Sequence, residues 1–137
     1  MKKKFCLLFV LVFVFVSIAQ FSVLASGIMP LNNNTNLTKT KFSISDTGEA
    51  VVSLNYEGYP NVTTGATISI KIEKRNLLFF WADVVEETIT VNNYYYANEL
   101  YYQFENTGTY RCTVEYVVSG TGGADDIITF EDTKTYN

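Results

Sequence analysis

Apolar and polar residues alternate along most of the chain, which is the period of a β-strand with one buried face. The clearest case is Ala66–Lys74, where Ile68, Ile70 and Ile72 share one face and polar residues occupy the other. No helical period persists, and turn signals rich in Gly, Asn and Asp separate the alternating segments. The pattern predicts about seven strands, namely Thr38–Ser45, Glu49–Glu57, Ala66–Lys74, Leu78–Val91 (with a bend near Ala82-Asp83), Leu100–Phe104, Thr109–Ser119 and Asp126–Thr135.

About seven short strands in roughly 100 residues predict an all-β fold of two packed sheets. The segment Asn106-Thr107-Gly108-Thr109-Tyr110-Arg111-Cys112 resembles the tyrosine corner of an immunoglobulin-like domain, in which Tyr lies two residues before Cys. This resemblance implies that Tyr110 hydrogen-bonds back across the corner and that Cys112 faces the core. Val52 and Leu54 occupy the positions where a partner cysteine is expected. The resemblance therefore implies an immunoglobulin-like two-sheet sandwich without a disulfide.

The N-terminus departs from the strand pattern. Met1–Lys4 is basic, Phe5–Ala19 is apolar, and Val23-Leu24-Ala25 places small residues near a cleavage point, as in a secretory signal peptide. An uncleaved membrane anchor is the alternative, because the 21 residues of Phe5–Ala25 are enough to span a bilayer. Polar residues within the run favour cleavage. We expect a signal peptide over residues 1–25, a flexible lead-in over 26–37, an immunoglobulin-like β-sandwich over 38–137, and a secreted, extracellular location.

Three segments of the chain carry a second resemblance. Thr63–Ile68, Lys74–Trp81 and Gly108–Asp132 resemble the corresponding parts of an uncharacterised group of short exported proteins from Gram-positive bacteria. This resemblance implies export and the sandwich fold, and it implies no functional site.

Composition narrows the classes of function. Without residues 1–25, seven basic residues face fourteen acidic ones, a net charge of −7. A chain this acidic would be repelled by nucleic acid and by anionic membranes, so we expect neither a nucleic-acid partner nor membrane insertion after cleavage.

The residues that usually perform catalysis are scarce. Histidine, the commonest general base and metal ligand, is absent. Cys112, the only cysteine after residue 25, has Val and Tyr neighbours that indicate a buried residue rather than a nucleophile. The carboxylates could form a glycosidase pair, but nothing in the sequence fixes their separation. We therefore expect a non-enzyme with no cofactor and no metal site.

The most apolar run after the signal is Leu77-Leu78-Phe79-Phe80-Trp81. In a strand its alternate members face opposite ways, which would leave Leu77, Phe79 and Trp81 outward, or the reverse. Exposed aromatic residues beside Lys74 and Arg75 could bind a partner, a sugar or a membrane. A strand that is covered on both faces is the alternative.

Two further clusters are candidate sites. The first consists of tyrosines near asparagine and glutamine, which stack on sugars and bind their hydroxyls, but which also suit an ordinary edge strand. The second, Asp125-Asp126, could begin a calcium site, although adjacent strand residues point to opposite faces and a solvated turn is the simpler interpretation. The tyrosines are Tyr94, Tyr95, Tyr96, Tyr101 and Tyr102.

The sequence thus leads to several hypotheses of function. The first is an exported, non-catalytic binding module for an extracellular protein partner or surface, with Phe79 and Trp81 as contact residues. The second is a module that binds carbohydrate or cell-wall glycan through the tyrosines. A secreted toxin or inhibitor is a third.

Overall fold

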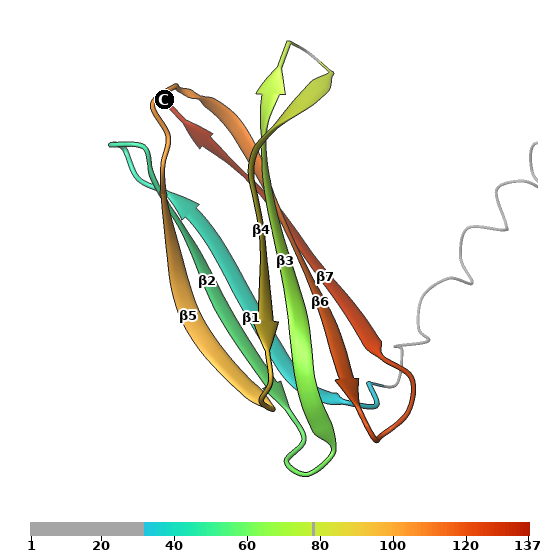
Figure 1. The fold of residues 1–137 in the computed structure, drawn as a ribbon. Helices are drawn as coiled ribbons and strands as arrows, with labels where there is room; N and C mark the ends of the chain where they lie inside the picture. Colours follow the sequence, from blue (N-terminus) through green and yellow to red (C-terminus); the bar gives the residue numbers. More distant parts are fainter. Residues whose placement is uncertain (1–31, 78) are drawn as a thin grey trace, which may run out of the picture. The chain divides into compact units, whose positions relative to one another are not determined.

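The computed structural model describes residues 32–77 and 79–137, so the predicted signal peptide and residues 26–31 of the predicted lead-in lie outside the described residues. Every regular element in these ranges is a β-strand. None of the described residues belongs to a helix long and apolar enough to cross a bilayer. The strands are β1 (Thr35–Ile44), β2 (Glu49–Gly58), β3 (Thr63–Asn76), β4 (Phe80–Val91), β5 (Tyr95–Gln103), β6 (Gly108–Gly120) and β7 (Asp126–Tyr136) (Figure 1).

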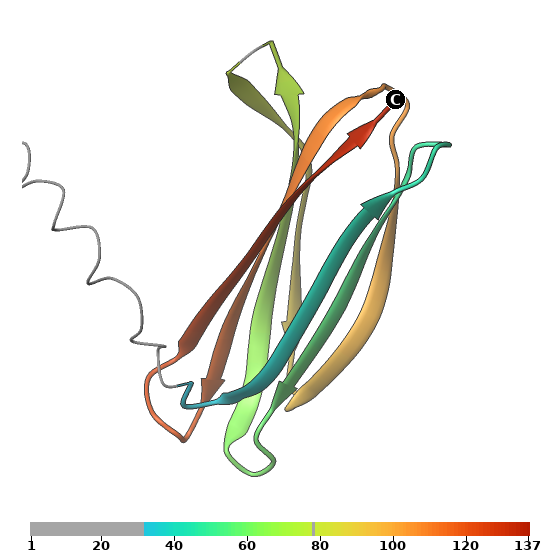
Figure 2. The ribbon, with the colours of Figure 1, turned by 180° about the vertical axis from the view of Figure 1, so that it is seen from behind.

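The seven strands form two antiparallel sheets. One sheet has three strands in the order β1-β2-β5, and the other has four in the order β4-β3-β6-β7. Figures 1 and 2, which view the domain from opposite sides, show the sheets as two layers of a sandwich. The prediction of an all-β domain with about seven strands in two sheets is confirmed.

The core lies between the inward faces of the two sheets. The predicted alternation in β2, β3 and β6 is confirmed, because every second residue is buried from Ala50 to Tyr56, from Ala66 to Ile72 and from Tyr110 to Val118. Burial of each such aliphatic side chain contributes about 1.5–3 kcal/mol. The Tyr116 hydroxyl on β6 shares a hydrogen bond of 2.7 Å with Thr40 Oγ1 on β1, which satisfies both groups and links the two sheets. The buried residues of these three strands include Ala50, Val52, Leu54, Tyr56, Ile68, Ile70, Ile72, Cys112, Val114, Tyr116 and Val118.

Strand β1 begins at Thr35, three residues earlier than the alternation predicted. The cause is Asp126, whose carboxylate accepts backbone N–H bonds from Asn33 (2.8 Å), Asn34 (2.7 Å) and Thr35 (2.8 Å). Asn34 and Thr35 are fully buried, and Asp126 itself is 6% exposed. The interpretation of Asp125-Asp126 as a solvated turn is therefore wrong for Asp126, which holds the start of β1 against the start of β7.

The apolar run predicted as one strand contains a turn instead. Asn76 pairs with Phe80, and Leu77 and Phe79 lie in the turn between β3 and β4. Leu77 has a φ of 54°, a left-handed conformation that is unfavourable for a residue with a side chain. Asn76, the last residue of β3, is the one turn-forming residue beside this turn, and the sequence has neither glycine nor proline there.

Two other strand features follow from pairing. The bend predicted near Ala82-Asp83 corresponds to a β-bulge, because Ile72 pairs with Val85 and Glu73 with Asp83. Strand β5 begins at Tyr95, five residues earlier than predicted, because its first residues pair with the end of β2.

Residues 32–137 constitute one compact unit. A chain that starts at Ser26, the predicted mature N-terminus, therefore contains the whole core.

Candidate functional site

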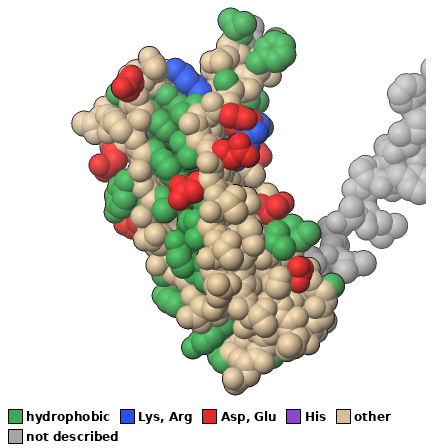
Figure 3. Space-filling model, viewed as in Figure 1, with side chains coloured by type: hydrophobic (Ala, Val, Ile, Leu, Met, Phe, Trp, Pro, Cys, Tyr) green, Lys and Arg blue, Asp and Glu red, His purple; other side chains and the backbone are tan. Residues whose placement is uncertain are grey.

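The β3–β4 hairpin ends in a cluster of exposed apolar side chains, which we call the hairpin tip and define as Leu77, Phe79 and Phe80. Their exposed fractions are 86%, 82% and 69%, the highest among the large hydrophobic residues that the structure describes. The hairpin extends past the neighbouring strands, and Figure 3 shows hydrophobic side chains at its extremity. Large apolar side chains exposed at a protruding turn contribute nothing to the core, which makes the hairpin tip a candidate contact surface.

Trp81 lies below the hairpin tip and is only half-buried. Two guanidinium groups approach its ring, with Arg75 at 5.1 Å and Arg111 at 4.4 Å from the ring centroid. Each cation–π contact of this kind contributes about 0.5–1 kcal/mol at an exposed site. Trp81 therefore packs against two arginines at the base of the hairpin and remains partly exposed to solvent.

Ion pairs connect the two strands of the hairpin at its base and connect β3 to β6. Arg111 Nε and Nη2 donate to Glu73 Oε2 at 3.0 and 2.7 Å, and the Glu73 side chain is 11% exposed. Lys71 Nζ lies 2.9 Å from Asp83 and 3.5 Å from Glu73. Hydrogen-bonded charges that are partly withdrawn from water hold a defined geometry. The hairpin tip therefore lies at the end of a hairpin whose base is held by ion pairs.

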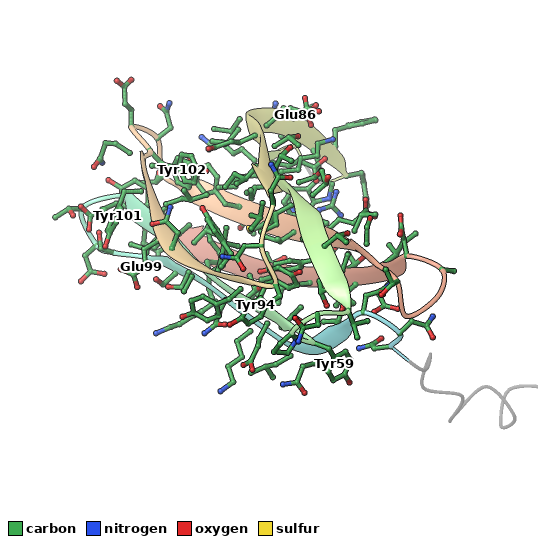
Figure 4. All side chains as sticks on the ribbon, turned by 60° about the horizontal axis from the view of Figure 1, so that its bottom comes forward. Tyr59, Glu86, Tyr94, Glu99, Tyr101 and Tyr102 are labelled. Atoms are coloured by element: carbon green, nitrogen blue, oxygen red, sulfur yellow. The ribbon has the colours of Figure 1, made fainter. Side chains whose placement is uncertain are left out.

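The structure does not gather the predicted tyrosines into one platform. Tyr95 and Tyr101 point outward from β5, with exposed fractions of 49% and 60%, whereas Tyr96 and Tyr102 are half-buried on its other face. Figure 4 shows Tyr101 and Tyr102 far from Tyr94, which precedes β5. The run of adjacent tyrosines in the sequence is thus split by the two-residue period of the strand.

Tyr102 has a structural role. Its hydroxyl donates to Glu87 Oε2 at 2.8 Å, which links β5 in one sheet to β4 in the other. Burial first, and then the hydrogen bond and the negative charge of Glu87, raise the pKa of the Tyr102 hydroxyl.

Cys112 is fully buried on β6. Burial, followed by the negative charge of Asp132, raises the pKa of the Cys112 thiol to about 12. The thiol is therefore protonated at neutral pH and has little nucleophilic character. Within the ranges 32–77 and 79–137, no three Cys, Asp or Glu residues are grouped so that they could hold a metal ion.

An open groove of about 450 Å³, which the sequence pattern did not predict, crosses the outer face of the three-stranded sheet. Its lining includes Lys39 and Lys41 from β1 and Ala97 from β5. Two features of the sequence could have indicated this groove. They are the alternation Lys39-Thr40-Lys41 in β1 and the small residue Ala97 at an outward position of β5. The groove appears only when the three strands are in register.

Comparison of the chain with protein-family models, with curated proteins and with solved structures finds no match. Function is therefore inferred from the exposed side chains and their chemistry.

Proposed function

We propose that the chain is an exported, non-catalytic binding module of the immunoglobulin-like kind, and that its hairpin tip contacts a protein partner outside the cell. The proposal rests on the exposure of Leu77, Phe79 and Phe80 at the end of a hairpin whose base is held by ion pairs. Apolar residues at such a place are favourable only when a second surface covers them.

The tip supplies enough apolar surface to anchor an interface. Transfer of one Leu or Phe side chain from water into a pocket contributes about 1.5–3 kcal/mol, so the three side chains contribute of order 5 kcal/mol before the costs of association. Arg75 and the half-buried Trp81 form the next strand pair below the hairpin tip. Trp and Arg are enriched among the interface residues that contribute most to binding energy. A pocket on a partner protein with a polar rim would match this arrangement.

The tyrosine corner supports the immunoglobulin-like assignment. The Tyr110 hydroxyl donates to the carbonyl oxygen of Asn106 at 2.5 Å, as the resemblance implied. Its ring stacks on Phe104 with centroids 4.1 Å apart, and Gly108 has a φ of 149°, which favours glycine. One difference from the constant-type arrangement is that β4 pairs with β3 rather than with β5.

Export is supported by the basic, apolar and small-residue parts of residues 1–25. A non-catalytic role is supported by the protonated Cys112 thiol and by the absence of histidine from the sequence.

The test uses a labelled chain that starts at Ser26 and intact cells of the organism that produces it. A variant with Leu77→Ser, Phe79→Ser and Phe80→Ser removes the apolar tip. The matched control is Ile127→Ser, because Ile127 is an apolar residue on β7 that is 65% exposed. All the substituted side chains are exposed, so each variant is expected to unfold at the wild-type urea concentration.

Saturable binding by the wild type and by Ile127→Ser, together with its loss in the tip variant, would support the proposal. Protease treatment of the cells beforehand should abolish the binding, because the proposed partner is a protein. The proposal is wrong if the tip variant binds as well as the wild type, or if binding survives proteolysis of the cell surface.

A further inference from the structure

The groove on the outer face of the three-stranded sheet lies on the opposite sheet from the hairpin tip. Leu54 of β2 points into the core, so its neighbours Ser53 and Asn55 point outward into the groove. Strand register then places two rows of side chains across the three strands. One row is Lys39, Asn55 and Ala97, and the other is Lys41, Ser53 and Glu99.

The β1 side of the groove is cationic. Lys39 and Lys41 are both exposed, and Thr40 between them faces the core, where it bonds to Tyr116. Neither lysine forms an ion pair with any other described residue. Residues two apart in a strand are separated by about 7 Å, so two ammonium groups line this side at a spacing suited to two acidic groups of one ligand.

The β5 side of the groove offers a hydrogen-bond acceptor. Glu99 accepts hydrogen bonds from the Tyr101 hydroxyl at 2.6 Å and from Ser53 Oγ at 3.1 Å, and Figure 4 shows Tyr101 and Glu99 side by side. The hydrogen bond from Tyr101, and then that from Ser53, lower the pKa of the Glu99 carboxyl, which is ionised at neutral pH. The lining of the groove therefore favours a ligand that carries acidic groups towards β1 and hydroxyl donors towards β5.

Two tyrosine rings bracket the groove along β5. Ala97 is the small outward residue that leaves room for an occupant, with Tyr95 two positions before it and Tyr101 four positions after it on the same face. Six strand residues span about 20 Å, so an occupant that touches both rings is an extended chain. Exposed tyrosine rings offer flat apolar faces with a polar edge, which suit the faces of sugar rings.

We propose that this groove binds an acidic polysaccharide, a chain of sugars that carry carboxylates. Such a chain supplies carboxylates for Lys39 and Lys41, hydroxyls for Glu99, and ring faces for the tyrosines. A peptide that adds as a β-strand fits less well, because it would pair at an edge of the sheet, along β1 or β5, and would not lie across this face. The site is separate from the hairpin tip and does not depend on the function proposed for the tip.

The test measures affinity by titration calorimetry with a chain that starts at Ser26. The ligands are oligomers of galacturonate, guluronate and hyaluronan, each about eight sugars long. We expect saturable binding to at least one of them, and a loss of about tenfold or more in Lys39→Gln/Lys41→Gln, because two charge contacts disappear. Lys74→Gln/Lys134→Gln is the matched control, since it changes the net charge equally at the other sheet and should bind as the wild type does. Ala97→Tyr, which fills the groove, should also abolish binding.

Further ligands separate the alternatives. A neutral dextran oligomer and the galacturonate monomer should bind much more weakly than the acidic oligomer. Equal binding of polyglutamate would indicate attraction by charge alone and would overturn the proposal, as would no binding to any of the three acidic oligomers at millimolar concentration. The triple hairpin-tip variant should keep its glycan affinity, so failure of one proposed site remains distinguishable from failure of the other.

Discussion

The carboxylate of Asp126 is the polar group on which the N-terminal end of the sandwich depends most. Its Oδ2 accepts the N–H groups of Asn34 and Thr35, and its Oδ1 accepts that of Asn33. Replacement by alanine removes all three bonds and leaves two buried N–H groups without an acceptor. A hydrogen bond to a charged group contributes about 1.5–3 kcal/mol, but three bonds to one carboxylate are not additive. We expect Asp126→Ala to lower the free energy of unfolding by about 3–5 kcal/mol.

Asparagine is the informative second substitution. Its carbonyl oxygen can replace Oδ2 and keep the bonds from Asn34 and Thr35, while its amide group faces the more exposed N–H of Asn33. We therefore expect Asp126→Asn to cost about 1–2 kcal/mol. Urea unfolding at pH 7, followed by the fluorescence of Trp81, the only tryptophan, measures both values. A cost below about 1 kcal/mol for Asp126→Ala would refute this account of how β1 begins.

The same carboxyl predicts a dependence on pH. Burial acts to raise the pKa of Asp126, but the N–H bonds from Asn33, Asn34 and Thr35 outweigh it, and the folded-state pKa is lowered. A lowered pKa means that the stabilisation is fully present above the unfolded value of about 3.9 and is lost as the pH falls through the folded value. The stability difference between wild type and Asp126→Asn should thus be constant from about pH 7 to pH 5 and shrink below about pH 4. A difference that grows as the pH falls would contradict this sign.

Three further predictions concern the four-stranded sheet. Tyr110→Phe removes the hydrogen bond to the carbonyl oxygen of Asn106 and should cost about 1 kcal/mol in urea unfolding; an unchanged midpoint would show that the corner does not depend on it. Cys112, with a pKa of about 12, should stay unmodified by a thiol reagent at pH 7 until urea unfolds the chain, so rapid labelling of the native protein would contradict its burial. Arg111→Ala leaves the nearly buried carboxylate of Glu73 without its strongest partner and should cost about 1–3 kcal/mol, and wild-type stability in this variant would mean that water or Lys71 replaces the guanidinium.

The sequence alone determined the fold class and most of the core. The two-residue alternation of β2, β3 and β6 placed the inward residues correctly, because burial of one face is a local property of each strand. The segment Asn106–Cys112 also predicted that the Tyr110 hydroxyl bonds back across the corner and that Cys112 is buried.

The candidate sites depended on tertiary structure. The sequence from Leu77 to Trp81 is an unbroken apolar run, yet the chain reverses between Asn76 and Phe80, because β4 pairs antiparallel with β3. That reversal converts a predicted strand into an exposed apolar tip. Adjacent tyrosines were likewise separated when β5 paired with β2 and sent alternate side chains to opposite faces.

Contacts between residues distant in the sequence decided the rest. Asp126 lies 91 to 93 positions from the three N–H groups that it binds, and Lys41 meets Ser53 and Glu99 only through the register of three strands. A sequence records which residues are able to donate, accept or stack, and its local period records which of them share a face. The contacts between these residues are decided by the pairing of strands and the packing of sheets. The energies of pairing and packing depend on the whole core.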